Sequence, residues 1–513
     1  MTTKSHEVTR REFIRQASCA ALELTGVVNT MGFLRLTNAA VIQGNLYQAN
    51  DYKALVCIFL AGGNDANNLL VPMGTAAANP ARQDYEAART VVALPVNELH
   101  SLNVPNATSA FDRHYGDGTF TMGVHPNAQP LAELFNSQEL AFVCNVGSLL
   151  YPIPNREAYV NQIVERPPRL FAHNTQQMQW QTSIPDQVGA VGWGGRMADL
   201  LNAGYNGDAS KASMSISLAG INAFQRGMLP ETAAFALSSN GVRSLSGFGT
   251  NYANAVEAGS TFDNPIYKDT RQGGRLKTLE QLVRLTNQNL LEDEYAQKLV
   301  AARTVEGVVG DSLSAADNSN VDFETIFADA QSSLGNQLKM IAKLIAGRSA
   351  LGNRRQIFFA RVGGYDNHNN LLTAHAPLMT ELANSLKAFR DALVASGEWN
   401  NTVAFTASDF ARTLSPNSDG TDHAWGSHAM VLGGPIKGGD LYGHYPPLKV
   451  GNVAGSMDSQ GRGRIIPTTS VDQYSAPLAR WFGADSNSME TIFPNLVRFD
   501  DPFSSATANL QFI

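Results

Sequence analysis

The sequence predicts an α/β fold: a doubly wound, mostly parallel sheet with helices on both faces and an inserted cap region. Short apolar runs typical of buried strands alternate with longer segments in which apolar residues recur at helical spacing. This alternation is typical of a parallel sheet covered on both faces. Several of the apolar runs are followed directly by acids or histidines, and folds of this class build their ligand sites where strands end.

The first half of the chain supplies two buried strands. Residues 52–60 (YKALVCIFL) form the first, with AGGNDANN as its exit loop, and residues 140–146 (LAFVCNV) form the second. Between them, HPNAQPLAELFN at residues 125–136 predicts a loop that enters a short helix. A glycine-started helix is expected at residues 192–202, and alternating polarity at residues 213–219 predicts a half-buried strand.

The second half repeats the alternation after a polar insertion. Residues 229–322 are rich in Ser, Asn, Gly and Thr and contain one helical pattern at 276–305, so we expect an inserted variable or cap region there. The main domain is then divided into residues 50–228 and 323–513. The elements expected in the second part are a helix at 323–345, a strand at 355–362, a helix at 371–396, strands at 403–406 and 429–432, and a helix at 467–482.

Charge and cysteine content limit the class of protein. The 513 residues carry a net charge of −7, which argues against nucleic acid or an anionic membrane surface as the main partner. Three cysteines, Cys19, Cys57 and Cys144, are too few for a disulfide framework. Cys57 and Cys144 each lie in an apolar run, which predicts two buried thiols; a bridge between them is the alternative that export would permit.

The N-terminus resembles an export signal. TRREFIR at residues 9–15 contains Arg10 and Arg11 followed by Phe13 and Ile14, a pattern similar to a twin-arginine signal. Residues 1–40 are therefore expected to be a signal region read by the twin-arginine translocase, which would place the protein in the periplasm or cell envelope. The alternative is an amphipathic helix that happens to contain two arginines. No later run is apolar for the roughly 18–20 residues that a stable membrane span requires.

Acids and histidines follow three of the expected strands. Asp65 lies beyond the first strand, Asp366 and His368 follow residues 355–362, and Asp409 follows residues 403–406. His423 lies before the apolar run MVLGG. Carboxylates with imidazoles suit zinc-like or manganese-like divalent cations. For Asp65 alone an Asx-turn is the simpler interpretation, and for His423 a surface turn; the cluster of three strand ends favours a metal site.

The motifs also resemble a known family. FLAGGNDANNLLVP, HPNAQPLAELF, LFAHNTQQMQWQT, GWGGRMADLL, FFARVGGYDNHNN, SDFARTL and GTDHAWGSHAMVLGG, together with TRREFIR and GGDLYG, are similar to the bacterial family known as domain of unknown function 1501, within the alkaline phosphatase-like superfamily. The resemblance implies a two-metal site, with zinc or manganese as the ions, that acts on phosphate or sulfate esters. It implies as ligands the residues Asp65, Asp366, His368, Asp409 and His423.

Two departures from the superfamily pattern concern catalysis. Phe410 follows Asp409 where phosphatases usually have a ligating histidine, and Asn155 replaces the serine of a sulfatase-like P-S-R in PNR. No residue matches the usual nucleophile clearly. Thr175 is the fallback candidate, because a helix N-terminus expected there can hold an anion; the alternative is that Thr175 is a plain N-cap.

Two functions remain open at this point. The first is an exported metal-dependent hydrolase of phosphate or sulfate esters, with a small ester or a polymer as substrate. The second is a non-catalytic cell-envelope protein on the same fold that binds a polymer or assists secretion or assembly. The retained acids and histidines favour the first, and the missing nucleophile favours the second.

Overall fold

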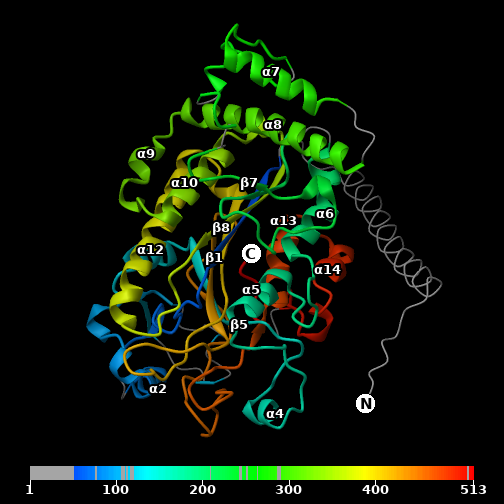
Figure 1. Ribbon diagram of the computed structural model, residues 1–513. Coiled ribbons are helices and arrows are strands. Elements are labelled where there is room, and N and C mark those ends of the chain that lie inside the picture. Colours follow the sequence, from blue (N-terminus) through cyan, green and yellow to red (C-terminus); the bar gives the residue numbers. More distant parts are fainter. Residues whose placement is uncertain are drawn as a thin grey trace, which may run out of the picture.

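The computed structural model describes residues 51–513 apart from short gaps. The gaps are residues 76–77, 105–109, 111–113, 116–120, 208–209, 242–244, 250–251, 263, 286–289 and 505–507. The expected signal region, residues 1–40, lies outside the described residues. The described chain is an α/β fold around one large sheet, with a small sheet beside it (Figure 1).

The large sheet has nine strands in the described residues, in the order β11-β5-β10-β9-β1-β8-β6-β7, with β12 also paired to β5. The small sheet is antiparallel, in the order β2-β4-β3. The strands are β1 (Lys53–Leu60), β2 (Leu70–Pro72), β3 (His100–Leu102), β4 (Met122–Val124), β5 (Leu140–Gly147), β6 (Ser215–Ser217), β7 (Phe235–Ala236), β8 (Arg355–Val362), β9 (Thr402–Ser408), β10 (Ser427–Gly433), β11 (Leu441–Gly443) and β12 (Thr469–Ser470).

Three parallel strands at the centre of the sheet determine where the site can form. β1 pairs in parallel with β8 on one side and with β9 on the other, so the carboxyl ends of all three lie at the same edge. One long strand runs the other way: β10 is antiparallel to both β9 and β5. The expected mostly parallel sheet is therefore confirmed, with β10 as its antiparallel member.

Helices cover both faces of the sheet, because the central strands are apolar on both faces. In β1, Ala54, Val56 and Ile58 pack into one core, whereas Leu55 and Phe59 pack into the other. Figure 1 shows α10 and α12 on the first side and α6, α13 and α14 on the second. The helices are α2 (Pro80–Arg89), α3 (Gln129–Asn136), α4 (Arg156–Val160), α5 (His173–Thr182), α6 (Trp193–Tyr205), α7 (Arg271–Val283), α8 (Leu290–Asp317), α9 (Phe323–Ile326), α10 (Ser333–Ala346), α11 (Arg348–Leu351), α12 (Leu371–Ala395), α13 (Val471–Phe482) and α14 (Ser486–Ile492).

Two expected helices are divided in the structure. The pattern at residues 276–305 belongs to α7 and α8, which Figure 1 shows at the end of the molecule away from α4. The helix expected at residues 323–345 is interrupted because the Ser332 side chain accepts from the Gly335 N–H and so starts a new helix, α10. Local capping overrides the continuous apolar spacing there.

The thiols and the membrane prediction can be compared directly with the structure. Cys57 in β1 and Cys144 in β5 are buried free cysteines, so the thiol interpretation is confirmed and the alternative bridge does not form. Among the described residues, no helix combines the length and the apolar character that a membrane crossing needs.

Candidate metal centre

The loops that leave β1, β8 and β9 are tied together at the carboxyl edge of the sheet. The Gly62 N–H donates to Asp409 Oδ1 at 3.2 Å, and the Tyr365 N–H donates to the Ala61 carbonyl at 3.3 Å. A Cβ at Gly62 would lie 2.6 Å from the Asp366 nitrogen, so only glycine permits this approach of the two loops. The adjacency predicted from the strand ends is thereby built with backbone contacts.

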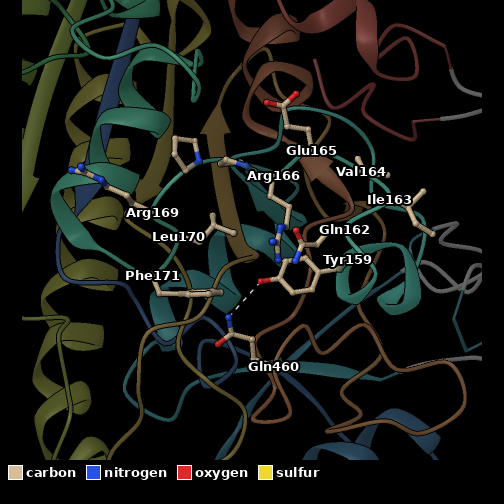
Figure 2. Close-up of a pocket in the computed structure, with 12 residues that line it drawn as sticks. Tyr159, Gln162, Ile163, Val164, Glu165, Arg166, Arg169, Leu170, Phe171 and Gln460 are labelled. Carbon is tan, nitrogen blue, oxygen red and sulfur yellow. Dashed lines mark hydrogen bonds between the residues drawn. The ribbon is translucent and has the colours of Figure 1, made fainter.

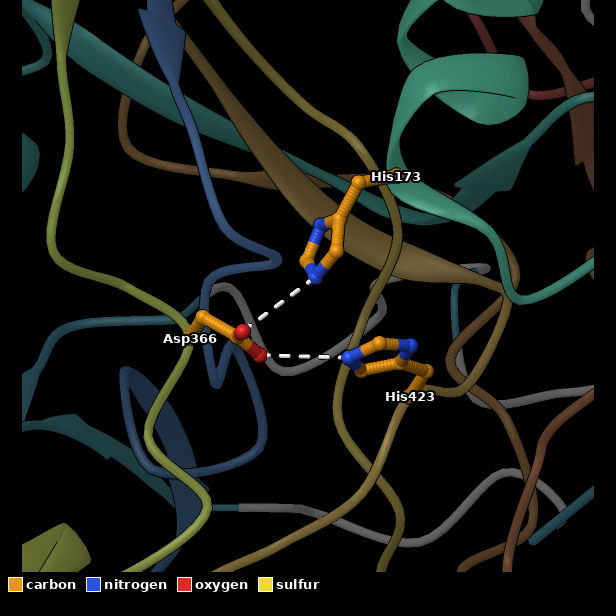
Figure 3. A group of neighbouring side chains, drawn as sticks. All are labelled: His173, Asp366 and His423. Atoms are coloured by element: carbon orange, nitrogen blue, oxygen red, sulfur yellow. Dashed lines mark hydrogen bonds and ion pairs between the residues drawn. The ribbon is translucent and has the colours of Figure 1, made fainter.

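One carboxylate and two imidazoles converge at this edge. Asp366 follows β8, His423 lies in the loop between β9 and β10, and His173 is the first residue of α5 (Figure 3). His173 Nε2 is 3.3 Å from Asp366 Oδ2, and His423 Nε2 is 3.2 Å from Asp366 Oδ1. One potential ligand atom from each residue lies within 4.8 Å of the others, which makes this a candidate site for a metal ion.

The partners of the outer ring nitrogens determine where the hydrogens are. His423 Nδ1 lies 2.8 Å from the Phe171 carbonyl, which can only accept, so this nitrogen carries the hydrogen. His173 Nδ1 lies 2.6 Å from Asp409 Oδ2 and is the donor for the same reason. In the neutral imidazole, both Nε2 atoms therefore present a lone pair toward Asp366. Burial lowers the pKa of His423, which favours that neutral form.

His368 adds a third imidazole to the group. Its Nε2 is 3.0 Å from Asp366 Oδ1 and 3.0 Å from His423 Nε2, while its Nδ1 faces Asp422 Oδ1 at 3.2 Å. The Asp422 carboxylate thus assigns the hydrogen to Nδ1 of the neutral ring. Three outer nitrogens, each directed at an oxygen, leave three Nε2 atoms turned inward.

Asp366 is held in its ionised form by a buried arginine. Burial raises the pKa of this carboxyl, but the hydrogen bond and charge of Arg412, together with His173 and His368, outweigh it, so the pKa is lowered overall. Arg412 Nη1 donates to Asp366 Oδ1 at 2.6 Å, and its side chain is fully buried. Other donors of the guanidinium are used by Thr421. The ionised carboxylate fixed in this way faces the imidazoles.

Asp409 lies behind His173 and not beside Asp366. Its side chain is fully buried, and Oδ2 accepts from both His173 Nδ1 and Gln177 Nε2, the latter at 2.8 Å. Oδ1 accepts from the Gly62 N–H. Both oxygens are therefore engaged, and the carboxylate orients an imidazole. Phe410, the departure noted in the sequence, packs its ring 4.8 Å from His173 and 4.7 Å from His423.

Asp65 is paired elsewhere. Its Oδ2 lies 2.6 Å from Arg89 Nη2, and both side chains are completely buried. Arg89 is fixed in turn by the Thr413 carbonyl at 3.1 Å. The structure therefore brings together Asp366, His368 and His423 from the expected ligands, places Asp409 one layer behind them, and commits one oxygen of Asp65 to an ion pair.

The site residues fall within a region that matches one family model. Residues 52–460 match the family described as "Protein of unknown function (DUF1501)". The chain belongs to the DUF1501 family. Asp366, His423 and His173 all lie inside the matched region. No curated protein matches the chain.

Solved structures with some likeness to this DUF1501 chain are remote. The crystal structure of Ps i-CgsB has a TM-score of 0.31 at 9% identity, covering 89% of this chain and 78% of that one. Ps i-CgsB in complex with k-i-k-neocarrahexaose scores 0.28 at 8% identity with the same coverage. PsFucS1 sulfatase from Pseudoalteromonas sp. scores 0.28 at 10% identity, covering 82% and 69%. A likeness at this level says nothing about substrate or mechanism.

Thr175 occupies a different place from the one expected in this DUF1501 chain. The helix α5 begins at His173 with Ala172 as its N-cap, so Thr175 lies inside the first turn and is not the N-cap. Its hydroxyl donates to Asn174 Oδ1 at 3.4 Å. The N-cap therefore lies three residues earlier than the N-cap interpretation placed it, at a residue whose side chain makes no capping hydrogen bond.

His173 is the site residue that the sequence did not reveal. It follows an irregular stretch rather than a strand, so the argument from strand ends does not reach it. The one available signal is its position in AHNTQQ, a histidine entering a helix at the end of a proline-rich segment. Only the tertiary fold brings this helix start to the carboxyl ends of β8 and β9.

The residues present fit one divalent cation. His173 Nε2 is buried and has no hydrogen-bond partner among the described residues, although it lies against a carboxylate. Metal–nitrogen bonds of about 2.0–2.1 Å in a tetrahedral site place ligand atoms about 3.3–3.4 Å apart. The separations of 3.0–3.3 Å between neighbouring atoms of Asp366 and the imidazoles are close to that spacing. A second layer of carboxylate and carbonyl acceptors on the imidazoles is also typical of metal sites.

Proposed function

We propose that this chain is an exported metal-dependent hydrolase of phosphate or sulfate esters. The observation that carries the proposal is the set of inward-facing Nε2 lone pairs around Asp366. Lone pairs and a carboxylate that face one another across about 3 Å repel unless a cation lies between them. The nitrogen atoms that face outward are fixed by Asp409, Phe171 and Asp422, so the imidazoles cannot turn away without losing those bonds.

The donor set favours zinc, and a single ion. Imidazole nitrogens suit zinc better than manganese, which prefers oxygen ligands. His173, Asp366 and His423 would hold the ion, and His368 lies in contact with two of them. The bound ion would supply an activated water and would stabilise negative charge on an ester oxygen.

The chain itself contributes an anion-binding environment next to the imidazoles. The N-cap of α5, Ala172, makes no side-chain capping bond, so the backbone N–H groups of the first turn can donate to an ester oxygen. The buried guanidinium of Arg412 keeps Asp366 ionised and compensates its charge. Phe410 excludes water from one side of the imidazoles. These groups bind, orient and desolvate an ester at the place where the imidazoles converge.

Delivery by the twin-arginine translocase to the periplasm or cell envelope is part of the proposal. It rests on TRREFIR in the sequence, which lies outside the described residues. That route carries folded proteins, which suits an enzyme that acquires its ion before export. A small ester or a polymer that bears ester groups would be the substrate, and nucleic acid is not expected because of the negative net charge.

A binding protein on the same fold is the alternative. It is favoured by the Thr175 hydroxyl, which lies inside the first turn of α5 and donates to Asn174 rather than being held by a base. Such a protein would keep the ion to recognise an anionic polymer without cleaving it. The two functions share the centre and differ only in turnover.

Metal content and an ester assay separate these outcomes. Purified protein is expected to contain about one zinc ion per chain by mass spectrometry and to cleave nitrophenyl phosphate, its diester or nitrophenyl sulfate. His423→Ala should lose both zinc and activity. His100→Ala, whose imidazole lies in β3 and contacts the Pro126 carbonyl, should lose neither. Zinc without turnover of any of these esters would favour the binding protein. Protein that binds no divalent ion would refute the centre itself.

A further inference from the structure

A pocket of about 810 Å³ opens beside the metal centre (Figure 2). Its wall is the segment from the end of α4 to the start of α5, closed on the other side by Gln460. This volume lies in the range of pockets that hold small ligands. The lining residues are Tyr159, Gln162, Ile163, Val164, Glu165, Arg166, Pro167, Pro168, Arg169, Leu170, Phe171 and Gln460.

Phe171 belongs to both the pocket and the metal centre. Its carbonyl accepts from His423 Nδ1 at 2.8 Å, while its ring forms part of the pocket wall. Arg464 makes a second connection, because its Nε donates to the His423 carbonyl at 2.8 Å and its guanidinium lies 4.5 Å from the centre of the Phe171 ring. A second branch of the same guanidinium reaches Gln460. A ligand in the pocket is therefore one residue away from the imidazoles.

Arg166 provides an available positive charge in this pocket. Its guanidinium lies 4.7 Å from the centre of the Tyr159 ring, and Tyr159 is itself buried against Trp425. No hydrogen bond or ion pair engages the Arg166 side chain within the described residues. The aromatic ring holds the charge in place without using its N–H donors, which is the arrangement that an incoming anion needs.

The surroundings do not neutralise that charge. Among the lining residues, Glu165 is the one acid, and Figure 2 shows its carboxylate turned away from the Arg166 guanidinium. No ion pair joins the two side chains in the described structure. Arg169 also belongs to this wall, but Figure 2 shows its guanidinium turned away from Arg166. The charge directed into the lining is therefore that of Arg166.

Backbone strain is concentrated in the same wall. Gln162, Arg169 and Phe171 have φ values of 54°, 51° and 68°. These values lie in the left-handed region of the backbone, which residues other than glycine rarely adopt. Strain of this kind costs about 1–3 kcal/mol per residue and persists where the surrounding structure enforces it, often at binding sites. The strained conformation of Phe171 is what directs its carbonyl to His423 while its ring faces the pocket.

We propose that this pocket is a second anion site, built around Arg166, that binds an acidic group on the part of the substrate that is not hydrolysed. The preferred ligands would be molecules with at least two acidic groups, one at the metal centre and one at Arg166. Sulfate, phosphate and carboxylate share the required chemistry. The substrate role rests on the proposed hydrolase function, but anion binding by the pocket does not depend on turnover.

Calorimetry with the purified full-length protein tests the site. The probes are dextran sulfate oligosaccharides, tripolyphosphate and oligogalacturonate, which distinguish the three acidic groups, with neutral dextran as the uncharged control. Arg166→Gln should weaken binding of the preferred anion about tenfold, the loss expected for one charged hydrogen-bonding partner. Arg166→Lys should recover part of it. Arg275→Gln is the matched control, because Arg275 also stacks on an aromatic ring, 5.8 Å from the centre of Phe248, but lies in α7. The affinity of this variant for the same anion should stay within about twofold of the wild type.

Two further readouts keep the outcome clear. The bound anion should protect Arg166 of the wild-type protein from phenylglyoxal, which requires no variant to fold. Equal binding by the wild type and Arg166→Gln, an equal loss in Arg275→Gln, or equal binding of neutral dextran would overturn the anion site. Protein that binds no metal but shows Arg166-dependent anion binding would refute the hydrolase proposal, whereas the anion site in the pocket would stand. Metal-dependent ester cleavage together with anion binding that Arg166→Gln leaves unchanged would refute the anion site and support the hydrolase.

Discussion

Asp409 is fully buried behind His173, and its replacement by asparagine is expected to weaken zinc binding without unfolding the protein. The carboxylate accepts three hydrogen bonds, from His173, Gln177 and the Gly62 N–H. Asparagine has the same shape but only one acceptor oxygen. If that oxygen faces Gly62, the amide nitrogen faces His173 Nδ1, and two donors then oppose each other. The imidazole escapes this clash by moving its hydrogen to Nε2, which removes the lone pair directed at Asp366.

The size of the effect follows from this loss of orientation. Removing the partner of a metal-bound histidine typically costs about 10–100-fold in metal affinity, or about 1.4–2.7 kcal/mol. Because Asp409 is the only side-chain acceptor of His173 Nδ1 in the described residues and is inaccessible to water, we expect the upper half of this range. The Gln177 amide can rotate to bond the new side chain, which limits the cost to the fold.

Zinc calorimetry and ester hydrolysis check the prediction, with Asp419→Ala as the control. Asp419 is exposed and contributes its backbone carbonyl to Leu371, which an alanine retains. Circular dichroism and thermal unfolding show whether Asp409→Asn folds. A folded Asp409→Asn protein with wild-type zinc affinity would refute the assignment of His173 Nδ1 as a donor to Asp409. Equal losses in both variants would show that the centre has been placed wrongly.

Three further predictions concern export and pH dependence. Changing Arg10 and Arg11 together to lysine should leave the protein in the cytoplasm, and normal periplasmic recovery in cell fractionation would contradict the export hypothesis. Burial lowers the pKa of His428 to about 3, so as the pH falls the unfolded state binds the proton first. The free energy of unfolding is therefore at its full value above about pH 6.5 and falls by about 1.4 kcal/mol for each pH unit from there toward pH 3. His428→Phe should flatten this part of a urea-unfolding series, and an unchanged slope would contradict the prediction. Burial raises the pKa of Asp472 to about 7, so its contribution to the free energy of unfolding is complete below about pH 4 and is lost as the pH rises through 7. Asp472→Asn should therefore be more stable than the wild type by about 4 kcal/mol at pH 8 and similar to it at pH 4. A constant difference at both pH values would count against the shifted pKa.

The sheet and its strand ends could be predicted because both depend on local pattern. The runs that became β1, β8 and β9 are apolar on both faces and end in glycine, serine or polar residues, so their type and their carboxyl ends are readable from the sequence. Asp366, which follows β8, was predicted for this reason. The direction of β10 was not predictable, because a continuous apolar run is equally suited to a parallel or an antiparallel neighbour.

The remaining part of the centre depends on tertiary contacts that leave no periodic signal. His173 arrives from the segment after β5, whose course is set by left-handed residues such as Arg169 and Phe171 that no propensity predicts. Whether an acid faces the ion or orients a ligating imidazole also depends on tertiary contacts. Asp409 follows its strand as closely as a ligand would, and only the position of α5 turns it into the partner of His173.

The surroundings of Asp65 argue for one ion in this centre. Its ion pair with Arg89 is sealed from solvent, with 2.6 Å between Oδ2 and Nη2. Asp65 Oδ1 has no partner, but the described residues contain no second group of three acids, histidines or cysteines that could join it around another ion. A dication bound to Asp65 alone would also face the Arg89 guanidinium in a region of low dielectric, where repulsion between charges is strong. We infer that Arg89 neutralises at Asp65 the charge that a second cation would otherwise balance. The chain then binds a single ion, held by His173, Asp366 and His423.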